Sequence, residues 1–231
     1  MTIRVGLVSD VHAYPAPLSE ALDLFEHHNV DLILCAGDIA GYGDSLDETV
    51  SLLTESQCQS IMGNHEIWYL EKTQDSAQQS CRYIRSLPRT REFNLAGKRL
   101  FMVHASPPDA YLGGIRLLNK QCEMDPEQVR YWTDKIAGFE YDVLVVGHTH
   151  QVFAEYLGST LVINPGSTAY NHSCAILTLT ESSPEPSRES RPGPGPESGV
   201  DFYALSGKKI SRCWNWGEQF KIRNKADGRA P

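Results

Sequence analysis

Residues 3–12 have the sequence IRVGLVSDVH, in which an apolar run leads into an aspartate and a histidine. The apolar part predicts a buried β-strand. Two further short strands are predicted at 32–36 and 59–62, and amphipathic helices at 17–28 and 45–56 separate the three strands. This β-α-β-α-β order predicts a parallel sheet with helices packed against it.

The rest of the chain adds two helical stretches and a series of strands. A polar helical stretch is predicted at 65–87, where Pro88 ends it, and a second helix is predicted at 125–137, which Asp125 can cap. Strands are predicted at 93–95, 99–104, 143–146, 152–156, 160–163, 175–179, 200–205 and 209–214. Alternating elements followed by a strand-rich half predict a mixed α/β (α+β) fold with two sheets.

The length of 231 residues predicts one domain over 1–224 and a flexible tail at 225–231. Residues 181–198 (ESSPEPSRESRPGPGPES) contain five of the 13 prolines and predict a mobile loop. Two interpretations of this loop stay open. It either binds a protein partner or is a tolerated insertion.

The charge balance argues against a non-specific nucleic-acid binder. The chain has 21 basic and 29 acidic residues, a net charge of −8, and no cluster of lysine and arginine. An anionic substrate therefore needs a locally positive site, which bound metal ions provide. No apolar run reaches the roughly 20 residues of a membrane helix, and the N-terminus has no signal-peptide pattern. Together with six cysteines that form no C-x-x-C pair, this predicts a cytoplasmic protein.

Five of the eight histidines fall in five short segments, four of which directly follow an apolar strand. The segments are Asp10-Val11-His12, Gly37-Asp38, Gly63-Asn64-His65-Glu66, Val103-His104 and Gly147-His148-Thr149-His150. The carboxyl ends of strands are where α/β sheets bind ligands. In extended backbone, residues i and i+2 point the same way, so Asp10 and His12 are expected to face one ion. His148 and His150 have the same spacing.

The donors in these segments are three oxygen and four nitrogen ligands: Asp10, Asp38, Asn64, His12, His104, His148 and His150. Seven donors are too many for one tetrahedral zinc ion. A mixed oxygen and nitrogen set suits two divalent ions of the Mn, Fe or Zn type that share one carboxylate. Each segment alone is common, but all five at strand ends predict a metal site.

In type and order, the five segments resemble the signature of the calcineurin-like metallophosphoesterase superfamily, over residues 10–150. Asn164-Pro165-Gly166-Ser167 is similar to a feature that follows the last ligand strand in that family. The variant at 37–43 (GDIAGYG) resembles the small prokaryotic phosphodiesterase-type branch. The resemblance implies a four-layer α/β/β/α sandwich, with two mixed β-sheets flanked by helices.

Carried over by position, the resemblance implies two divalent ions bridged by Asp38. One ion would be held by Asp10, His12, Asp38 and His150, and the other by Asp38, Asn64, His104 and His148. Manganese is favoured over iron, nickel and zinc. His65 would bind no metal, and would instead stabilise the phosphoryl charge or protonate the leaving group. The ions would activate a water for in-line attack and clamp the phosphate.

The chain departs from the family pattern after the first histidine. Many relatives have Gly-Asn there, and this chain has Ala13-Tyr14. Tyr14 is expected near the rim of the pocket. Either it binds substrate by stacking on a base or aromatic leaving group, or it is a turn residue packed on Pro15 or Pro17.

Two other departures concern relatives that dephosphorylate proteins. Those have a carboxylate three residues after the bridging aspartate, which orients the catalytic histidine, and here that position is Gly41. They also have an arginine after the Asn-His-Glu segment, where this chain has Ile67. Both departures argue against a protein phosphatase, and the first leaves the orienting partner of His65 unidentified. Glu66 is expected to form a local hydrogen bond at a helix start.

The expected function is a two-metal phosphoesterase that hydrolyses small phosphodiesters or nucleotides. A phosphomonoesterase or a nuclease of the same superfamily is the alternative within enzymes. From another class, a protein-interaction scaffold with a retained metal site stays open. The expected partner is a small phosphate ester or nucleotide, with neither long nucleic acid nor membrane, and the sequence sets no oligomeric state.

Overall fold

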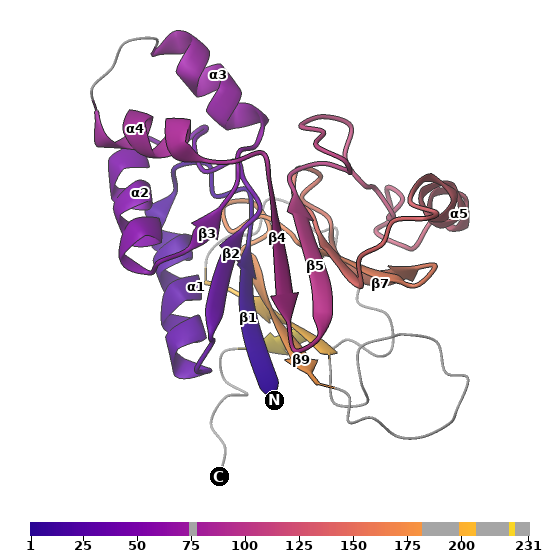
Figure 1. Cartoon of the computed structure of the whole chain (residues 1–231). Coiled ribbons are helices and arrows are strands. Elements are labelled where there is room, and N and C mark those ends of the chain that lie inside the picture. The colour runs from indigo at the N-terminus through magenta and orange to yellow at the C-terminus, as the bar shows by residue number, and fades with distance from the viewer. Residues whose placement is uncertain (74–77, 182–198, 207–221, 225–231) are drawn as a thin grey trace.

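A computed structural model describes residues 1–73, 78–181, 199–206 and 222–224 of the chain (Figure 1). Its first sheet holds six strands, which are β1 (Thr2–Val8), β2 (Leu32–Cys35), β3 (Gln59–Ser60), β9 (Ser173–Thr180), β10 (Gly199–Ala204) and β11 (Ile222–Asn224). The second sheet holds five, which are β4 (Thr90–Leu95), β5 (Lys98–Val103), β6 (Val143–Val145), β7 (Val152–Leu157) and β8 (Thr160–Pro165). The helices are α1 (Pro15–His27), α2 (Leu46–Glu55), α3 (Asn64–Lys72), α4 (Gln79–Ser86) and α5 (Pro126–Lys135).

The strand order shows two mixed sheets. In the first sheet the order is β11-β10-β9-β1-β2-β3, with β1, β2 and β3 parallel and β9 antiparallel to β1. In the second sheet the order is β4-β5-β6-β8-β7, with β5, β6 and β8 parallel. The predicted α/β fold with two mixed sheets is therefore confirmed, as is the parallel pairing of the first three strands.

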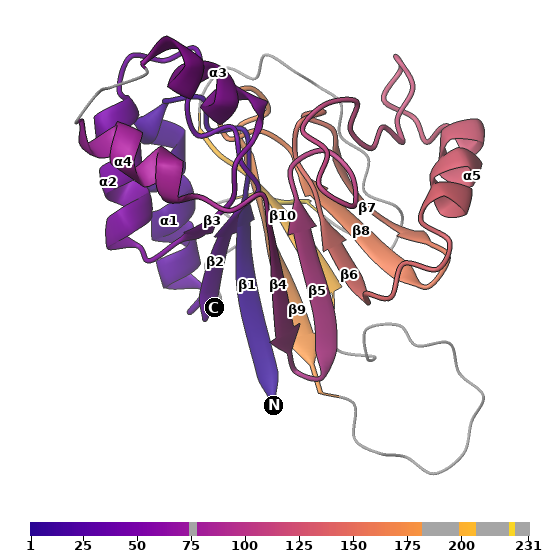
Figure 2. The ribbon, with the colours of Figure 1, turned by 45° about the horizontal axis from the view of Figure 1, so that its top comes forward.

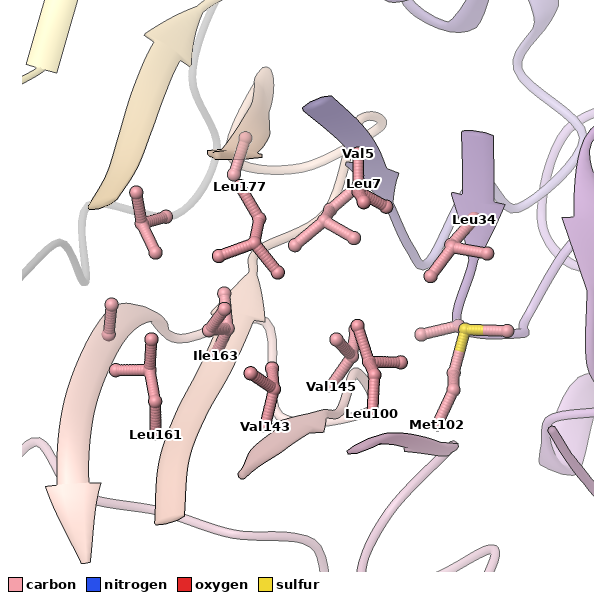
Figure 3. Close-up of a cluster of buried hydrophobic side chains, with 14 of the residues drawn as sticks. Val5, Leu7, Leu34, Leu100, Met102, Val143, Val145, Leu161, Ile163 and Leu177 are labelled. Carbon is pink, nitrogen blue, oxygen red and sulfur yellow. The ribbon is translucent and has the colours of Figure 1, made fainter. Parts of the chain in front are cut away.

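The main core lies between the two sheets (Figure 3). Val5 and Leu7 of β1 face Leu100 and Met102 of β5 across this layer, and all four side chains are fully buried. The alternate residues of the same strands point the other way, because side chains along a strand alternate between its faces. Phe101 of β5, for example, belongs to the core on the far side of its sheet.

Helices cover the outer faces of both sheets (Figure 2). Val8 and Cys35 pack against Leu18 and Phe25 of α1 in one outer core. The other outer core lies on the second sheet, where Val129 and Trp132 of α5 pack beside the buried side chains. The order of layers is thus helix, sheet, sheet, helix, as the family resemblance implies.

The predicted helix at 65–87 is wrong as a single element. The structure has α3 and α4 instead, with 74–77 outside the described residues. Gln78 has a ψ of 149°, which lies far from the helical region, so a continuous helix cannot pass through it. The predicted strand at 209–214, the tail at 225–231 and nearly all of the loop at 181–198 also fall outside the described residues. Their structure and the domain boundary stay predictions.

Candidate metal centre

The five histidine-bearing and acidic segments meet at one edge of the paired sheets. Asp10 follows β1, Asp38 follows β2, and Asn64 follows β3 in the first sheet. His104 follows β5, and the turn at 147–150 follows β6 in the second sheet. In Figure 1 the label N marks the lower end of β1, so the carboxyl ends of the strands lie at the opposite edge, beneath α3. Each sheet thus contributes part of the centre.

The first group of potential ligands contains Asp10, His12 and His150, whose donor atoms lie within 4.8 Å of one another. Nε2 of His150 is 3.2 Å from Oδ1 of Asp10 and 3.3 Å from Nε2 of His12. Asp10 and His12 are buried, and His150 is partly exposed. Two imidazole nitrogens and a carboxylate oxygen therefore converge at one point.

The second group contains Asp38, His104 and His148, again with donor atoms within 4.8 Å of one another. Nε2 of His104 is 3.3 Å from Oδ2 of Asp38 and 3.2 Å from Oδ1 of Asn64. The same amide oxygen of Asn64 is 2.9 Å from Nδ1 of His148. The seven predicted donors thus fall into two neighbouring clusters.

A third group links the two clusters and contains His12, Asp38 and His65. The backbone N–H of His65 donates to Oδ1 of Asp38 at 2.9 Å, and the His65 ring lies 4.6 Å from the ring of His12. His65 is half-buried, so its ring lies between the buried ligands and the surface. The expected position of His65 beside the metal ligands matches this arrangement, and its role stays a prediction.

The backbone of these segments differs from the expected extended form. Asp10 and His12 each have a φ of 52°, and the φ values of Asp38, His148 and His150 are 53°, 63° and 53°. This left-handed conformation is uncommon outside glycine and concentrates at functional sites. His148 and His150 consequently face different clusters, so the argument from i, i+2 spacing to one shared ion is wrong for this pair.

Backbone hydrogen bonds hold the strained segments against one another. The N–H groups of Asp10, His12 and Ala13 donate to the carbonyl oxygens of residues 37, 38 and 39 at 2.7–3.0 Å. The segment at 164–167 adds support from the second sheet. The Ser167 hydroxyl donates to the carbonyl oxygen of Asp10 at 2.6 Å, and the Asn164 amide donates to that of Gly147 at 2.9 Å.

Glu66 has a larger role than the expected local hydrogen bond. Its side chain is fully buried and accepts the N–H of Gly63 at 2.7 Å, which is the local contact at the start of α3. It also accepts the N–H groups of Asp38 at 2.9 Å and Ala40 at 2.7 Å. One carboxylate therefore ties the turn after β2 to the start of α3. No local sequence pattern indicates the two distant partners.

Two glycines leave room for the ligands. A Cβ at Gly63 would collide with the Asp38 carboxylate, and a Cβ at Gly41 would lie 2.6 Å from Nδ1 of His12. Gly41 therefore has no space for a side chain. His65 is flanked by rings instead, with the centroids of Tyr42 and Trp68 each 4.8 Å from its own.

Burial and charge shift the titration of these groups in the metal-free protein. Burial alone would raise the pKa of Asp10, but His150 and His104 hold that pKa well below its usual range. Burial alone would lower the pKa of His104, but the Asp38 carboxylate raises it to about 9. Burial lowers the pKa of His12 to about 4 and also depresses that of His65. His12 is therefore neutral at pH 7, which is the form that binds metals.

Aromatic side chains surround the site, and Tyr14 is the least engaged of them. Tyr14 precedes α1 and is 41% exposed, and among the described residues its ring contacts no histidine of the centre. Tyr42 and Tyr170 do contact these histidines, as Trp68 does through His65. Substrate binding by Tyr14 stays a prediction, and no local sequence pattern indicates the contacts of the other three rings.

Comparison with known proteins adds an independent finding. The profile of the calcineurin-like phosphoesterase superfamily domain matches residues 3–182, which include all five segments. A probable metallophosphoesterase of Methanothermobacter thermautotrophicus is 30% identical over 167 residues, covering 71% of this chain and 76% of that protein. An uncharacterised protein of Methanocaldococcus jannaschii is 26% identical over 180 residues, covering 70% of this chain and 68% of that protein.

The fold itself has a counterpart among solved structures. A hypothetical protein of Pyrococcus horikoshii superposes on this chain with a TM-score of 0.63 at 16% identity. The match covers 90% of this chain and 89% of that protein. Within the described part of the chain, no helix combines the length and the apolar character that crossing a bilayer requires.

Proposed function

Since this chain belongs to the calcineurin-like phosphoesterase superfamily, we propose that it is a two-metal phosphoesterase acting on small phosphodiesters or nucleotides. The family supports a hydrolase of phosphate esters, and the three clustered ligand groups support a metal site. The number of ions, the preference for manganese and the preference for diesters are parts of the proposal.

The observation that carries the proposal is the convergence of carboxylate, amide and imidazole atoms that can bind metal, contributed by both sheets. Nδ1 of His104 lies 2.7 Å from the carbonyl oxygen of Ala36, and since that oxygen only accepts, Nδ1 carries the ring proton. Nε2 faces Oδ1 of Asn64 and Oδ2 of Asp38. In the metal-free protein the raised pKa of His104 places a proton on Nε2 between these two oxygens, and a divalent cation bound by the same three atoms would replace that proton. A histidine that donates to a backbone carbonyl through its other nitrogen is typical of metal ligands.

The proposed ligand sets follow the two clusters. Asp10, His12, Asp38 and His150 would hold one ion, and Asp38, Asn64, His104 and His148 would hold the other. The bridging role of Asp38 is supported by its place in the candidate groups on both sides. Bound divalent cations would supply Lewis-acid chemistry, which acidifies water and neutralises phosphoryl charge.

Two side chains that bind no metal would have further roles at the site. The half-buried His65 ring, between the ligands and solvent, would stabilise the phosphoryl charge or deliver a proton to the departing oxygen. The buried Glu66 would fix the turn that carries Asp38 and the helix start that carries Asn64, so that both ligands keep their positions.

Two departures from the pattern of protein-dephosphorylating relatives support a small substrate. Relatives that dephosphorylate proteins carry a carboxylate at this position and an arginine at the position of Ile67. Neither group is present in this chain. We therefore favour small phosphate esters over phosphoproteins, and the resemblance of residues 37–43 to the phosphodiesterase-type branch favours diesters over monoesters.

A paired assay tests the proposal. Metal-stripped protein would receive Mn²⁺, Ni²⁺, Zn²⁺ or Mg²⁺ and would be assayed with an aryl phosphodiester and the matching monoester. We expect metal-dependent turnover that is faster for the diester and is lost in Asp38→Asn. Asp134→Asn, an exposed change on α5, is the matched control and should keep activity. Tight metal binding without turnover of either ester would contradict the enzyme proposal and favour the scaffold alternative.

A further inference from the structure

We propose that Tyr42 and Trp68 form a stacking platform that selects phosphodiesters carrying a planar aromatic group, such as a nucleoside. This inference rests on the proposed phosphoesterase activity and names the substrate class of the same site. Tyr170 completes the wall of the platform on the side of His150.

The first support is the exposure of large aromatic rings beside a buried polar centre. Tyr42 is 62% exposed and Trp68 is 45% exposed. Scattered surface aromatics need no explanation, but these two rings come from different elements and converge on one histidine. Tyr42 lies in the segment between β2 and α2, and Trp68 lies one helical turn after His65 in α3.

The second support is the position of the rings relative to His65. The centroids of Tyr42 and Trp68 are each 4.8 Å from the His65 ring, at interplanar angles of 69° and 59°. His65 is the group proposed to face the ester oxygen. A substituent on that oxygen would therefore leave the site within reach of both rings.

Tyr170 extends the aromatic surface towards the other cluster. Its ring stacks on His150 at 5.2 Å with an interplanar angle of 14°, and its centroid is 6.0 Å from that of Tyr42. Tyr170 lies between β8 and β9, so three separate parts of the chain supply the surface. An aromatic surface of this kind suits a flat, apolar group because base stacking on aromatic rings tolerates any base.

The platform is held in place before substrate binds. The N–H of Ala40 donates to buried Glu66, and the N–H of Gly43 donates to the carbonyl oxygen of His12 at 2.8 Å. Tyr42 lies between these two anchors. Trp68 follows Glu66 by two residues on the same helix. A backbone that is already anchored on both sides of Tyr42 does not have to be ordered on binding, which favours affinity.

The charge next to the platform favours an uncharged aromatic group. A cavity of about 370 Å³ is lined by Gly41 and Gly43, the two neighbours of Tyr42 in the chain, together with Asp44, Asp47 and Glu48. Further phosphate groups on the substrate would be repelled there. The uncharged base of a nucleoside would not be repelled.

The test compares two diesters that differ only in the base: adenosine 5′-methyl phosphate and ribose 5-methyl phosphate. Both would be given to the metal-loaded full-length protein, and the released products would be separated by chromatography. We expect kcat/KM to be about tenfold higher for the adenosine ester, mainly through a lower KM. Tyr42→Leu and Trp68→Leu should bring the ratio close to one, while Tyr42→Phe should keep it.

Tyr131→Leu is the matched control, because Tyr131 is 50% exposed on α5 and, among the described residues, its ring contacts Trp132 and no histidine of the centre. It should leave the ratio unchanged. A ratio near one in the wild-type protein, or a ratio that survives both leucine variants, would overturn the platform while leaving the phosphoesterase proposal intact. If neither diester is turned over, the phosphoesterase proposal fails. Calorimetric titration of the two esters then tests the platform by itself, and equal dissociation constants would overturn it.

Discussion

At the scale of single residues, Asp38 connects several parts of the centre through its backbone N–H and its carboxylate. Its N–H donates to Glu66, Oδ1 accepts the N–H of His65, and Oδ2 lies 3.3 Å from Nε2 of His104. Its carboxylate belongs to two candidate ligand groups, one with His104 and His148 and one with His12 and His65. Loss of its charge should therefore disturb both clusters at once, whereas Asp10 belongs to one group only.

This difference predicts unequal effects of two matched substitutions. Asp38→Asn should lower kcat by on the order of 1000-fold and remove most of the bound metal, because it weakens both ion sites. Asp10→Asn should cost less activity and leave more metal bound. Elemental analysis after gel filtration, together with initial rates, checks both. A greater metal loss in Asp10→Asn would contradict the bridging role of Asp38.

Substitution of His65 is expected to lower turnover without changing the metal content. His65→Ala should keep the full metal content, since no ligand is removed, while kcat falls by about 10²–10⁴-fold because a proton donor or charge-stabilising group is lost. The same elemental analysis and rate measurements apply. Loss of both ions in this variant would show that His65 is a ligand.

Substitution of Glu66 is expected to lower the stability of the protein, whereas substitution of an exposed glutamate on the same helix is not. In Glu66→Gln the amide NH₂ of the new side chain must face one of the N–H donors, so a buried donor loses its acceptor. We expect a loss of about 1–3 kcal/mol in the free energy of unfolding. Glu71→Gln is the exposed control on α3 and should change stability by less than about 0.5 kcal/mol. Urea denaturation in the presence of a chelator measures both, and equal midpoints would contradict the role of Glu66.

At the scale of elements, the close packing of α1 on β1 depends on one small residue. A Cβ at Gly6 would lie 2.7–2.9 Å from the ring of Phe25, which is fully buried. A glycine in the middle of a strand often marks such a close approach. The helix lies as near to the sheet as it does because this position has no side chain.

Gly6→Ala should therefore destabilise the protein by about 1–3 kcal/mol, as expected for overpacking. Gly199→Ala, in a strand where a Cβ meets open space, is the matched control and should have little effect. Combining Gly6→Ala with Phe25→Leu should recover part of the loss, because the smaller side chain gives room to the new methyl group. Denaturant titrations of the three variants check this, and a fully additive double variant would count against the contact.

The sequence predicted most elements and singled out the five segments that meet at one edge of the sheets, for a physical reason that also explains what it missed. Strands such as 3–9 and 143–146 have apolar patterns that are visible locally, and their ends locate the ligands. The partners of Glu66 lie 26 and 28 residues away, so no local pattern indicates them. The contacts of Tyr42 likewise depend on how two loops fold together. The break between α3 and α4 was missed because the polar composition at 65–87 favours a helix throughout.

At the scale of the whole molecule, the centre joins the two sheets. Asp10 and Asp38 follow strands of the first sheet, and His104 and His148 follow strands of the second. Ions bound by both sets would link the sheets at this edge, in addition to the apolar core between them.

Metal ions should therefore stabilise the global fold. Adding Mn²⁺ to stripped protein should raise the free energy of unfolding by about 2.7 kcal/mol at a hundredfold excess over the dissociation constant. Asp38→Asn should remove most of this gain, whereas Asp134→Asn should keep it. Thermal unfolding at increasing Mn²⁺ concentrations measures the effect. A melting temperature that is independent of Mn²⁺ would contradict a link between the sheets.

The antiparallel pairing of β1 with β9 has a consequence for synthesis on the ribosome. Thr2 pairs with Thr180, and Leu7 pairs with Ala175. One edge of β1 therefore stays unpaired until a segment about 170 residues later has been translated. Until then the nascent chain exposes an open strand edge flanked by apolar side chains, a state that is prone to aggregation. Translation speed and chaperone supply should therefore affect the yield of this protein more than that of a fold whose first strand pairs only with its sequence neighbours.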